Sequence, residues 1–183
     1  MTAPLHLIPH PVTPCPAVTG IHVRVNRTAD GGVDLAYVLS GAPALLRLPP
    51  PRPPGPADEL WRHTCCEAFI GIPGQPAYRE FNFSPSGQWA VYAFTDTRQR
   101  DGAFVPAAAA AALALRLLPD RLELDAHIPA ELLSSGVPLQ LGLSVVVEDR
   151  GGSLAYWALV HPADRPDFHL REGHTFALTD RPS

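Results

Sequence analysis

Apolar and polar residues alternate along much of the chain, which is the pattern of half-buried β-strands. Over residues 20–26, Ile21, Val23 and Val25 alternate with His22 and Arg24. The same period of two predicts further strands over 33–39, 65–72, 78–84, 88–95, 112–118, 121–128, 140–148, 153–160 and 175–179. Many short strands of this kind indicate an all-β sandwich or barrel.

Turn residues separate these strands and favour antiparallel pairing. The segments 30–32 (DGG) and 149–152 (DRGG) are typical of hairpin turns. Such short links cannot make the crossover that two parallel strands need. We therefore predict an antiparallel two-sheet β-sandwich formed by one domain, residues 20–183, preceded by an N-terminal arm over residues 1–19.

Three segments depart from the alternating pattern. The alanine run at 107–112 predicts a short helix before the next strand, because alanine is the best helix former. A helical turn is also expected over 129–133, with Pro129 at its first position. The segment 49–56 (PPPRPPGP) predicts a stiff extended loop, because proline has no N–H to donate to a sheet.

Charge and hydropathy exclude two classes of partner. The formal net charge is −4 over 183 residues, so the chain lacks the basic surface of a nucleic-acid-binding protein. No run of about 18 apolar residues occurs, so we expect no membrane-spanning helix. We therefore expect neither nucleic acid nor membrane as a partner, and the sequence does not indicate a particular protein partner.

The first residues and the cysteines indicate in which cellular compartment the protein is expected. Residues 1–14 have neither the basic start nor the apolar stretch of a signal peptide. The three cysteines are an odd number, and the neighbours Cys65 and Cys66 would point to opposite faces of a strand, where they cannot readily pair. Reduced thiols in the cytoplasm are the simplest account.

The segment 61–94 contains the most informative residues. Phe81 and Phe83 lie two positions apart and are expected in the core, so Glu80 and Asn82 face away from it. Glu67 on the preceding strand would share their face. Carboxylates and an amide beside aromatic rings suit a sugar, since polar groups fix hydroxyls and rings cover the apolar sugar faces. The alternative is an ordinary polar outer face of an antiparallel sheet.

Aromatic residues near this face are candidates for stacking on a sugar ring. Trp61, Tyr92 and Trp157 would serve as platforms, while Glu67 and Glu80 would bond the hydroxyl groups. The alternative for Trp61, as for Trp89, is a packing role.

Two stretches of the sequence resemble DOMON-like domains, which are relatives of the family 9 carbohydrate-binding modules. The first stretch comprises Trp61, His63, Cys66, Glu67, Phe69, the run YREFNFSPSG at 78–87 and Trp89. The second comprises Gly142, Ser144, Glu148, the run YWALVHP at 156–162 and the run PDFH at 166–169. The combination is similar to that of small stand-alone bacterial DOMON-like proteins.

The resemblance implies an immunoglobulin-like or jelly-roll-like sandwich that binds a ligand without catalysing a reaction. Relatives of this kind bind sugars or haem. Together with the outer-face residues, the resemblance gives a set of candidate ligand-binding residues: Trp61, His63, Glu67, Tyr78, Glu80, Asn82, Tyr92, Trp157, His161 and His169. We expect a small sugar-containing ligand and no cofactor or catalytic residue.

Haem is the main alternative ligand. Met1 is the only methionine, so a methionine ligand to the iron is excluded, and the remaining candidates are His63, His161, His169 and His174. No spacing of histidines and cysteines matches a zinc site, so no metal is expected.

Two further alternatives concern function. A glycosidase would need two facing carboxylates, and Glu67 and Glu80 would lie about 5 Å apart if they were directly opposite on neighbouring strands. A protein-interaction scaffold would instead present an exposed sheet edge or a flat apolar patch.

Overall fold

The computed structural model describes residues 3–106 and 111–179. Within these ranges the chain forms strands and four short 3-10 helices, and no helix is long and apolar enough to cross a membrane. The strands are β1 (Leu5–Pro9), β2 (Val18–Arg27), β3 (Val33–Gly41), β4 (Gly55–Pro56), β5 (Cys65–Gly71), β6 (Tyr78–Phe83), β7 (Gln88–Asp96), β8 (Gln99–Arg100), β9 (Ala112–Leu118), β10 (Arg121–Ile128), β11 (Leu139–Glu148), β12 (Leu154–Ala158) and β13 (Phe176–Leu178). The 3-10 helices are η1 (Pro43–Leu45), η2 (Leu60–Arg62), η3 (Ala130–Leu132) and η4 (Arg171–Gly173).

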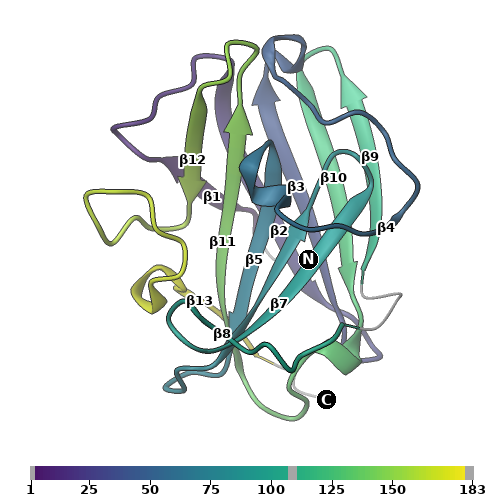
Figure 1. Cartoon of the computed structure of the whole chain (residues 1–183), viewed down its shortest axis with the longest axis vertical. Helices are drawn as coiled ribbons and strands as arrows, with labels where there is room; N and C mark the ends of the chain where they lie inside the picture. The colour runs from purple at the N-terminus through teal and green to yellow at the C-terminus, as the bar shows by residue number, and fades with distance from the viewer. Residues whose placement is uncertain (1–2, 107–110, 180–183) are drawn as a thin grey trace.

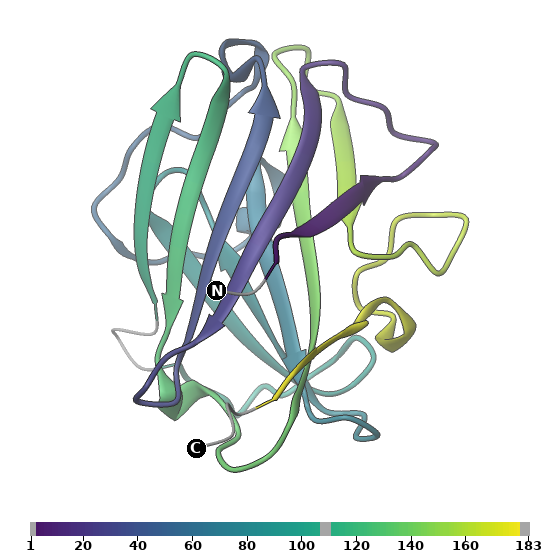
Figure 2. The same cartoon turned by 180° about the vertical axis from the view of Figure 1, so that it is seen from behind.

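The strands form one continuous curled sheet with two facing wings (Figure 1). The front wing has the order β4-β7-β6-β5-β11-β12, with β8 beside β7 and β13 beside β11. The rear wing has the order β2-β3-β10-β9, and β1 joins the two wings by pairing with both β12 and β2 (Figure 2).

The all-β class is confirmed, but the predicted architecture needs two corrections. The two expected sheets are one sheet, because Leu5 and Leu7 of β1 pair with β2 while Ile8 and Pro9 pair with β12. The pairing is also not wholly antiparallel. Strand β4 runs parallel to β7, with Gly55 opposite Gln88.

Strand β1 lies in the segment 1–19 that the sequence suggested was an arm. Of its side chains, Leu7 is buried and Ile8 is 49% exposed. The backbone N–H of His10 continues the pairing by donating to the carbonyl of Tyr156 at 2.7 Å. Residues 5–9 of the expected arm therefore lie within the sheet.

The proline-rich segment 49–56 reaches the sheet only at its end. Pro56 has no N–H, and the hydrogen bond to Trp89 O comes from the next residue, Ala57, at 2.9 Å. The stiff loop therefore docks beside β7 although its prolines donate nothing to the sheet.

The predicted turns and helical turns have different outcomes. The hairpin at 30–32 is confirmed: Gly31 has φ +89°, a conformation that glycine adopts without steric cost, and its N–H donates to Thr28 O. The helical turn near Pro129 is confirmed as η3, with Pro129 at the N-cap position. Most of the helix expected over 107–112 lies outside the described residues, and β9 begins at Ala112.

The main core lies between the two wings. Strands β2, β3 and β10 of the rear wing alternate largely as predicted, so that Leu35, Tyr37 and Leu39 of β3 are buried while their neighbours are more exposed. Strand β9 at the edge has no buried residue. Every residue of β5 is buried, however, and so is nearly all of β6. These two strands have lost their alternation in exposure because loops cover the outer face of the front wing as well.

Candidate functional site

The outer face of the front wing carries the polar residues that the sequence singled out. Ala68 of β5 and Phe81 of β6 face the main core, so Glu67, Glu80 and Asn82 point the other way. The prediction that these three residues share one face is confirmed. All three are nonetheless buried, with exposed fractions of 2%, 5% and 0% in that order.

The pairing of β5 with β6 fixes how the two glutamates lie. Glu67 is opposite Asn82, and Glu80 is opposite Phe69. The glutamates are therefore diagonal neighbours, whose separation along a sheet is about 7–8 Å between backbones, and not the directly opposed pair that the sequence allowed.

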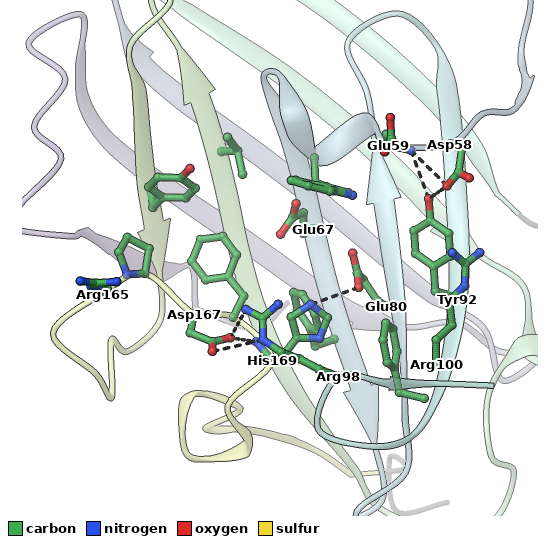
Figure 3. A pocket seen from close by; sticks show the side chains of 17 residues that line it. Asp58, Glu59, Glu67, Glu80, Tyr92, Arg98, Arg100, Arg165, Asp167 and His169 are labelled. Atoms are coloured by element: carbon green, nitrogen blue, oxygen red, sulfur yellow. Dashed lines mark hydrogen bonds and ion pairs between the residues drawn. The ribbon is translucent and has the colours of Figure 1, made fainter. Parts of the chain in front are cut away.

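A cavity of about 660 Å³ opens over this face. The two glutamates line it, and in Figure 3 their carboxyl groups lie between Asp167, Arg98 and His169 on one side and Tyr92 and Arg100 on the other. The apolar part of the lining is mostly aromatic: Trp61, Phe69, Tyr92, Phe94, Tyr156 and Phe168.

Glu67 has few partners in the cavity. Its Oε2 accepts a hydrogen bond from the hydroxyl of Ser144 at 3.2 Å, and within residues 3–106 and 111–179 it forms no ion pair. Burial raises the pKa of Glu67 well above its usual value, and the nearby Glu80 raises it further, while the bond from Ser144 acts in the opposite direction.

Glu80 is better supported. The side-chain amide of Asn82 donates to its Oε1 at 2.7 Å, and Nε2 of His169 lies 3.7 Å from its Oε2. Burial raises the pKa of Glu80, and the bond from Asn82 opposes that shift, as do the charges of Arg100 and Arg98. Asn82 therefore acts on the cavity indirectly, by orienting this carboxyl group.

Tyr78 holds His169 in place. The backbone N–H of Arg98 donates to the Tyr78 hydroxyl at 3.2 Å, and that hydroxyl forms a hydrogen bond with Nδ1 of His169 at 2.8 Å. Burial lowers the pKa of His169 to about 4, so the ring is neutral at pH 7.

Charged groups on the loops close the sides of the cavity. Arg98 binds both carboxylate oxygens of Asp167, at 2.9 and 3.4 Å, and Asp167 also accepts the backbone N–H of His169. This pair ties the loop after β12 to the turn after β7.

The opposite side is held by β7 and the segment before η2. The hydroxyl of Tyr92 donates to Asp58 and accepts the N–H of Glu59, while the guanidinium of Arg100 lies 4.2 Å from the centre of the Tyr92 ring. Burial raises the pKa of Tyr92, and the bond to Asp58 raises it further. Tyr92 therefore stays a neutral hydroxyl at the wall.

The arrangement suits hydrogen bonding to a small polar ligand with apolar faces. Trp61 on η2 is 46% exposed and lines the mouth of the cavity, with the guanidinium of Arg62 at 5.3 Å from the centre of its ring. Glu67 and Glu80 offer polar groups at the base, and Phe69 and Tyr156 offer flat walls. Most ligand sites share this combination of apolar lining and few polar groups.

Seven of the candidate residues from the sequence belong to this site or support it. The cavity lining includes Trp61, Glu67, Glu80, Tyr92 and His169. Tyr78 and Asn82 lie behind the lining and hold His169 and Glu80 in place.

Three candidate residues lie outside the cavity lining, contrary to the prediction. Trp157 belongs to the main core, since it alternates with the cavity residue Tyr156 along β12. His63 lies outside the cavity lining and is paired with Glu148 through a 2.7 Å contact. His161 contacts the carbonyl of Ile8 at 2.9 Å, next to the N-terminal strand.

The sequence did not identify the charged walls of the cavity. Arg98, Arg100 and Asp58 lie in polar segments with no motif, and only folding brings them together. Tyr156 and Phe168 belong to the runs that resemble DOMON-like domains, but the sequence did not single them out as ligand-binding residues. With the register of β12 known, alternation along the strand would place Tyr156, and not Trp157, on the cavity face.

The histidines proposed as haem ligands differ in how their ring nitrogens are engaged. In His174, Nδ1 contacts Arg171 at 2.8 Å and Nε2 contacts Phe168 O at 3.0 Å. His63 and His161 each have one ring nitrogen in contact with a protein group, Nδ1 with Glu148 in His63 and Nε2 with Ile8 O in His161. In the part of the chain that the structure describes, no three His, Cys, Asp or Glu side chains form a metal-binding group.

The cysteines lie as predicted on opposite faces of β5. Cys66 is in the main core, whereas the thiol of Cys65 is 3.7 Å from Oδ1 of Asn82 on the outer face. Burial raises the pKa of both thiols, so neither is a reactive thiolate.

Comparison with solved structures identifies proteins of similar fold. No protein-family model and no curated protein matches the sequence. A "putative carbohydrate-binding protein" from Bacteroides uniformis ATCC 8492 matches with a TM-score of 0.66 and 17% identity over 85% of this chain and 76% of its own.

Two further matches are structures of a family 9 carbohydrate-binding module from Caldicellulosiruptor kristjanssonii. The complex with glucose has a TM-score of 0.52 and 11% identity over 76% of this chain and 66% of its own. The complex with cellotriose has a TM-score of 0.51 and 13% identity over 84% of this chain and 71% of its own. At these identities the likeness shows the shared fold.

Proposed function

We propose that this chain is a non-catalytic carbohydrate-binding module whose ligand occupies the cavity on the outer face of the front wing. The observation that carries the proposal is the placement of two buried carboxyl groups, Glu67 and Glu80, at the base of a cavity of about 660 Å³ with aromatic walls. A monosaccharide or the end of an oligosaccharide fits this chemistry.

The proposed contacts follow from the position of each side chain. Trp61 and Tyr156 would cover the apolar faces of a sugar ring, and Glu67 and Glu80 would bond its hydroxyl groups. Nε2 of His169 lies 3.7 Å from Oε2 of Glu80 and offers a further polar contact at the same point.

Two independent lines support the proposal. The solved structures of similar fold include modules whose complexes contain glucose and cellotriose. The runs at 78–87 and 156–162 resemble DOMON-like domains, and we propose that relationship as well. A cavity with polar groups at its base also favours a small ligand over a protein partner, which would need a flat apolar patch.

Calorimetric titration of the full chain with glucose and cellotriose, together with a glycan array, tests the proposal. We expect binding of at least one glycan, and we expect Trp61→Ala to weaken it about tenfold, because an aromatic contact contributes roughly 1 kcal/mol or more. The matched control is Leu117→Ala, which truncates a 59% exposed side chain on β9 outside the cavity.

Three results would count against the proposal. The absence of binding to every glycan would remove the carbohydrate ligand. A Soret shift on titration with haem would favour the haem alternative. Turnover of aryl glycosides that Glu67→Gln abolishes would make the site catalytic, as in enzymes with paired carboxylates.

A further inference from the structure

Glu67 differs from most of the acidic groups that line the cavity. Asp167 pairs with Arg98, and Glu59 pairs with Arg62 at 2.7 Å. Asp58 forms no ion pair with a described residue but accepts the hydroxyl of Tyr92. Arg100 and Arg165 also line the cavity, and neither of them forms an ion pair with a described residue. The two glutamates at the base, Glu67 and Glu80, remain.

Of these two, Glu80 has an amide donor and lies near cationic groups, but Glu67 does not. The amide of Asn82 bonds Oε1 of Glu80, and the charges of Arg100 and Arg98 favour its ionised form. The carboxyl group of Glu67 receives a single bond, from Ser144 to Oε2, and Oε1 accepts none from the described residues. Glu67 is only 2% exposed, yet one of its carboxyl oxygens has no partner in the described part of the chain and faces the cavity.

The walls near Glu67 are rings. Phe168 meets Phe69 edge-on with centroids 6.4 Å apart, and meets Tyr156 edge-on at 5.9 Å. Trp61 lines the same cavity from η2. Ring faces carry partial negative charge and attract an ammonium group, and a bound ammonium would also favour the ionised form of the Glu67 carboxyl group.

We propose that the cavity selects an amino sugar, with its ammonium group against Glu67 and its ring between the aromatic walls. The inference rests on the proposed carbohydrate-binding function and names the class of sugar. An ammonium group supplies the donors and the positive charge that the protein itself does not bring to Glu67. A sugar acid would instead place a second negative charge beside Glu67 and Glu80.

The surroundings of Glu67 agree with a cationic ligand. The titratable groups that interact with it are Glu80 on β6, Cys65 and Cys66 on β5, Tyr37 on β3 and Tyr156 on β12. Each of these groups is neutral or acidic, so none of them stabilises an ionised Glu67. A bound ammonium would do so, and would release a proton from the site.

Calorimetry of the full chain at pH 7 tests the inference with glucosamine, glucose and N-acetylglucosamine. We expect glucosamine to bind at least tenfold more tightly than glucose, equivalent to about 1.4 kcal/mol. Acetylation removes the charge, so N-acetylglucosamine should lose that advantage. Heats measured in two buffers of different ionisation enthalpy should show proton release for glucosamine alone.

The decisive variant is Glu67→Gln, judged by the ratio of the glucosamine and glucose affinities. We expect the ratio to fall to within about twofold of unity, because glutamine keeps the shape and loses the charge. Glu131→Gln on η3 is the matched control, since Glu131 is exposed and lies outside the cavity, and it should keep the ratio of the unmodified chain.

The possible failures are distinguishable. Equal affinity for glucosamine and glucose would overturn the inference but leave the proposed function standing. A preference for glucosamine that remains in the Glu67→Gln variant would have the same consequence. Binding of tetramethylammonium without binding of any sugar would overturn the proposed function and, with it, the choice of an amino sugar.

Discussion

Glu67 shows how a single residue departs from the ordinary behaviour of its type. It is 2% exposed and accepts a bond from Ser144, so the folded state favours its protonated form. Ionisation of such a buried carboxyl group at higher pH lowers the stability of the folded state. Such a cost is consistent with a group retained for a ligand.

We predict that Glu67→Gln stabilises the chain, and more so as the pH rises. The pKa of Glu67 is raised from 4.5 by folding, so its penalty is absent below that pH and grows above it. Urea unfolding should give nearly equal free energies for both proteins at pH 4 and an advantage of at least about 1 kcal/mol for the variant at pH 8. The same difference at both pH values would contradict the assignment of burial as the cause.

At the scale of elements, the alternating pattern located the longer strands to within about two residues. It missed β1, β4 and β8 for local reasons. Two of these strands have two residues each, and β1 lies in a proline-containing segment between Pro4 and Pro9. Short strands of this kind form because neighbouring strands offer them hydrogen bonds. The alternation of apolar and polar residues in the sequence does not report such pairing.

Strand β1 provides a test at this scale, because it joins the wings. Leu7→Ala should lower the free energy of unfolding by about 2–4 kcal/mol, since Leu7 is 4% exposed and packs in the main core. Ile8→Ala, at the next position but 49% exposed, should change it by less than about 0.5 kcal/mol. Guanidinium unfolding of both variants gives the comparison, and equal losses would show that β1 contributes no specific packing.

The whole molecule assembles the cavity from segments far apart in the sequence. Strands β5 and β6 supply the glutamates, the segment 58–61 supplies Trp61, and the turn at 96–100 meets the loop at 165–169 through Arg98 and Asp167. These loops also bury His169 and His174, whose pKa values fall to about 4. Closure of the cavity therefore depends on two neutral histidines.

The dependence of stability on pH should report this closure. A histidine whose pKa falls from 6.5 to about 4 on folding adds stability above pH 6.5 that is lost as the pH falls toward 4, up to about 3 kcal/mol. We predict that His174→Gln shows a shallower loss between pH 6.5 and 4 than the unmodified chain in urea unfolding. An unchanged slope would mean that His174 is not buried as the structure shows.

The sequence by itself determined the all-β class, most strands and the common face of Glu67, Glu80 and Asn82, because side-chain alternation is a local property of each strand. Only the tertiary structure decided that these residues are buried, that Tyr156 and not Trp157 faces the cavity, and that Arg98 reaches Asp167. Those features depend on register and on loops that pack across the sheet. Such contacts join residues distant in the chain, and no local pattern encodes them.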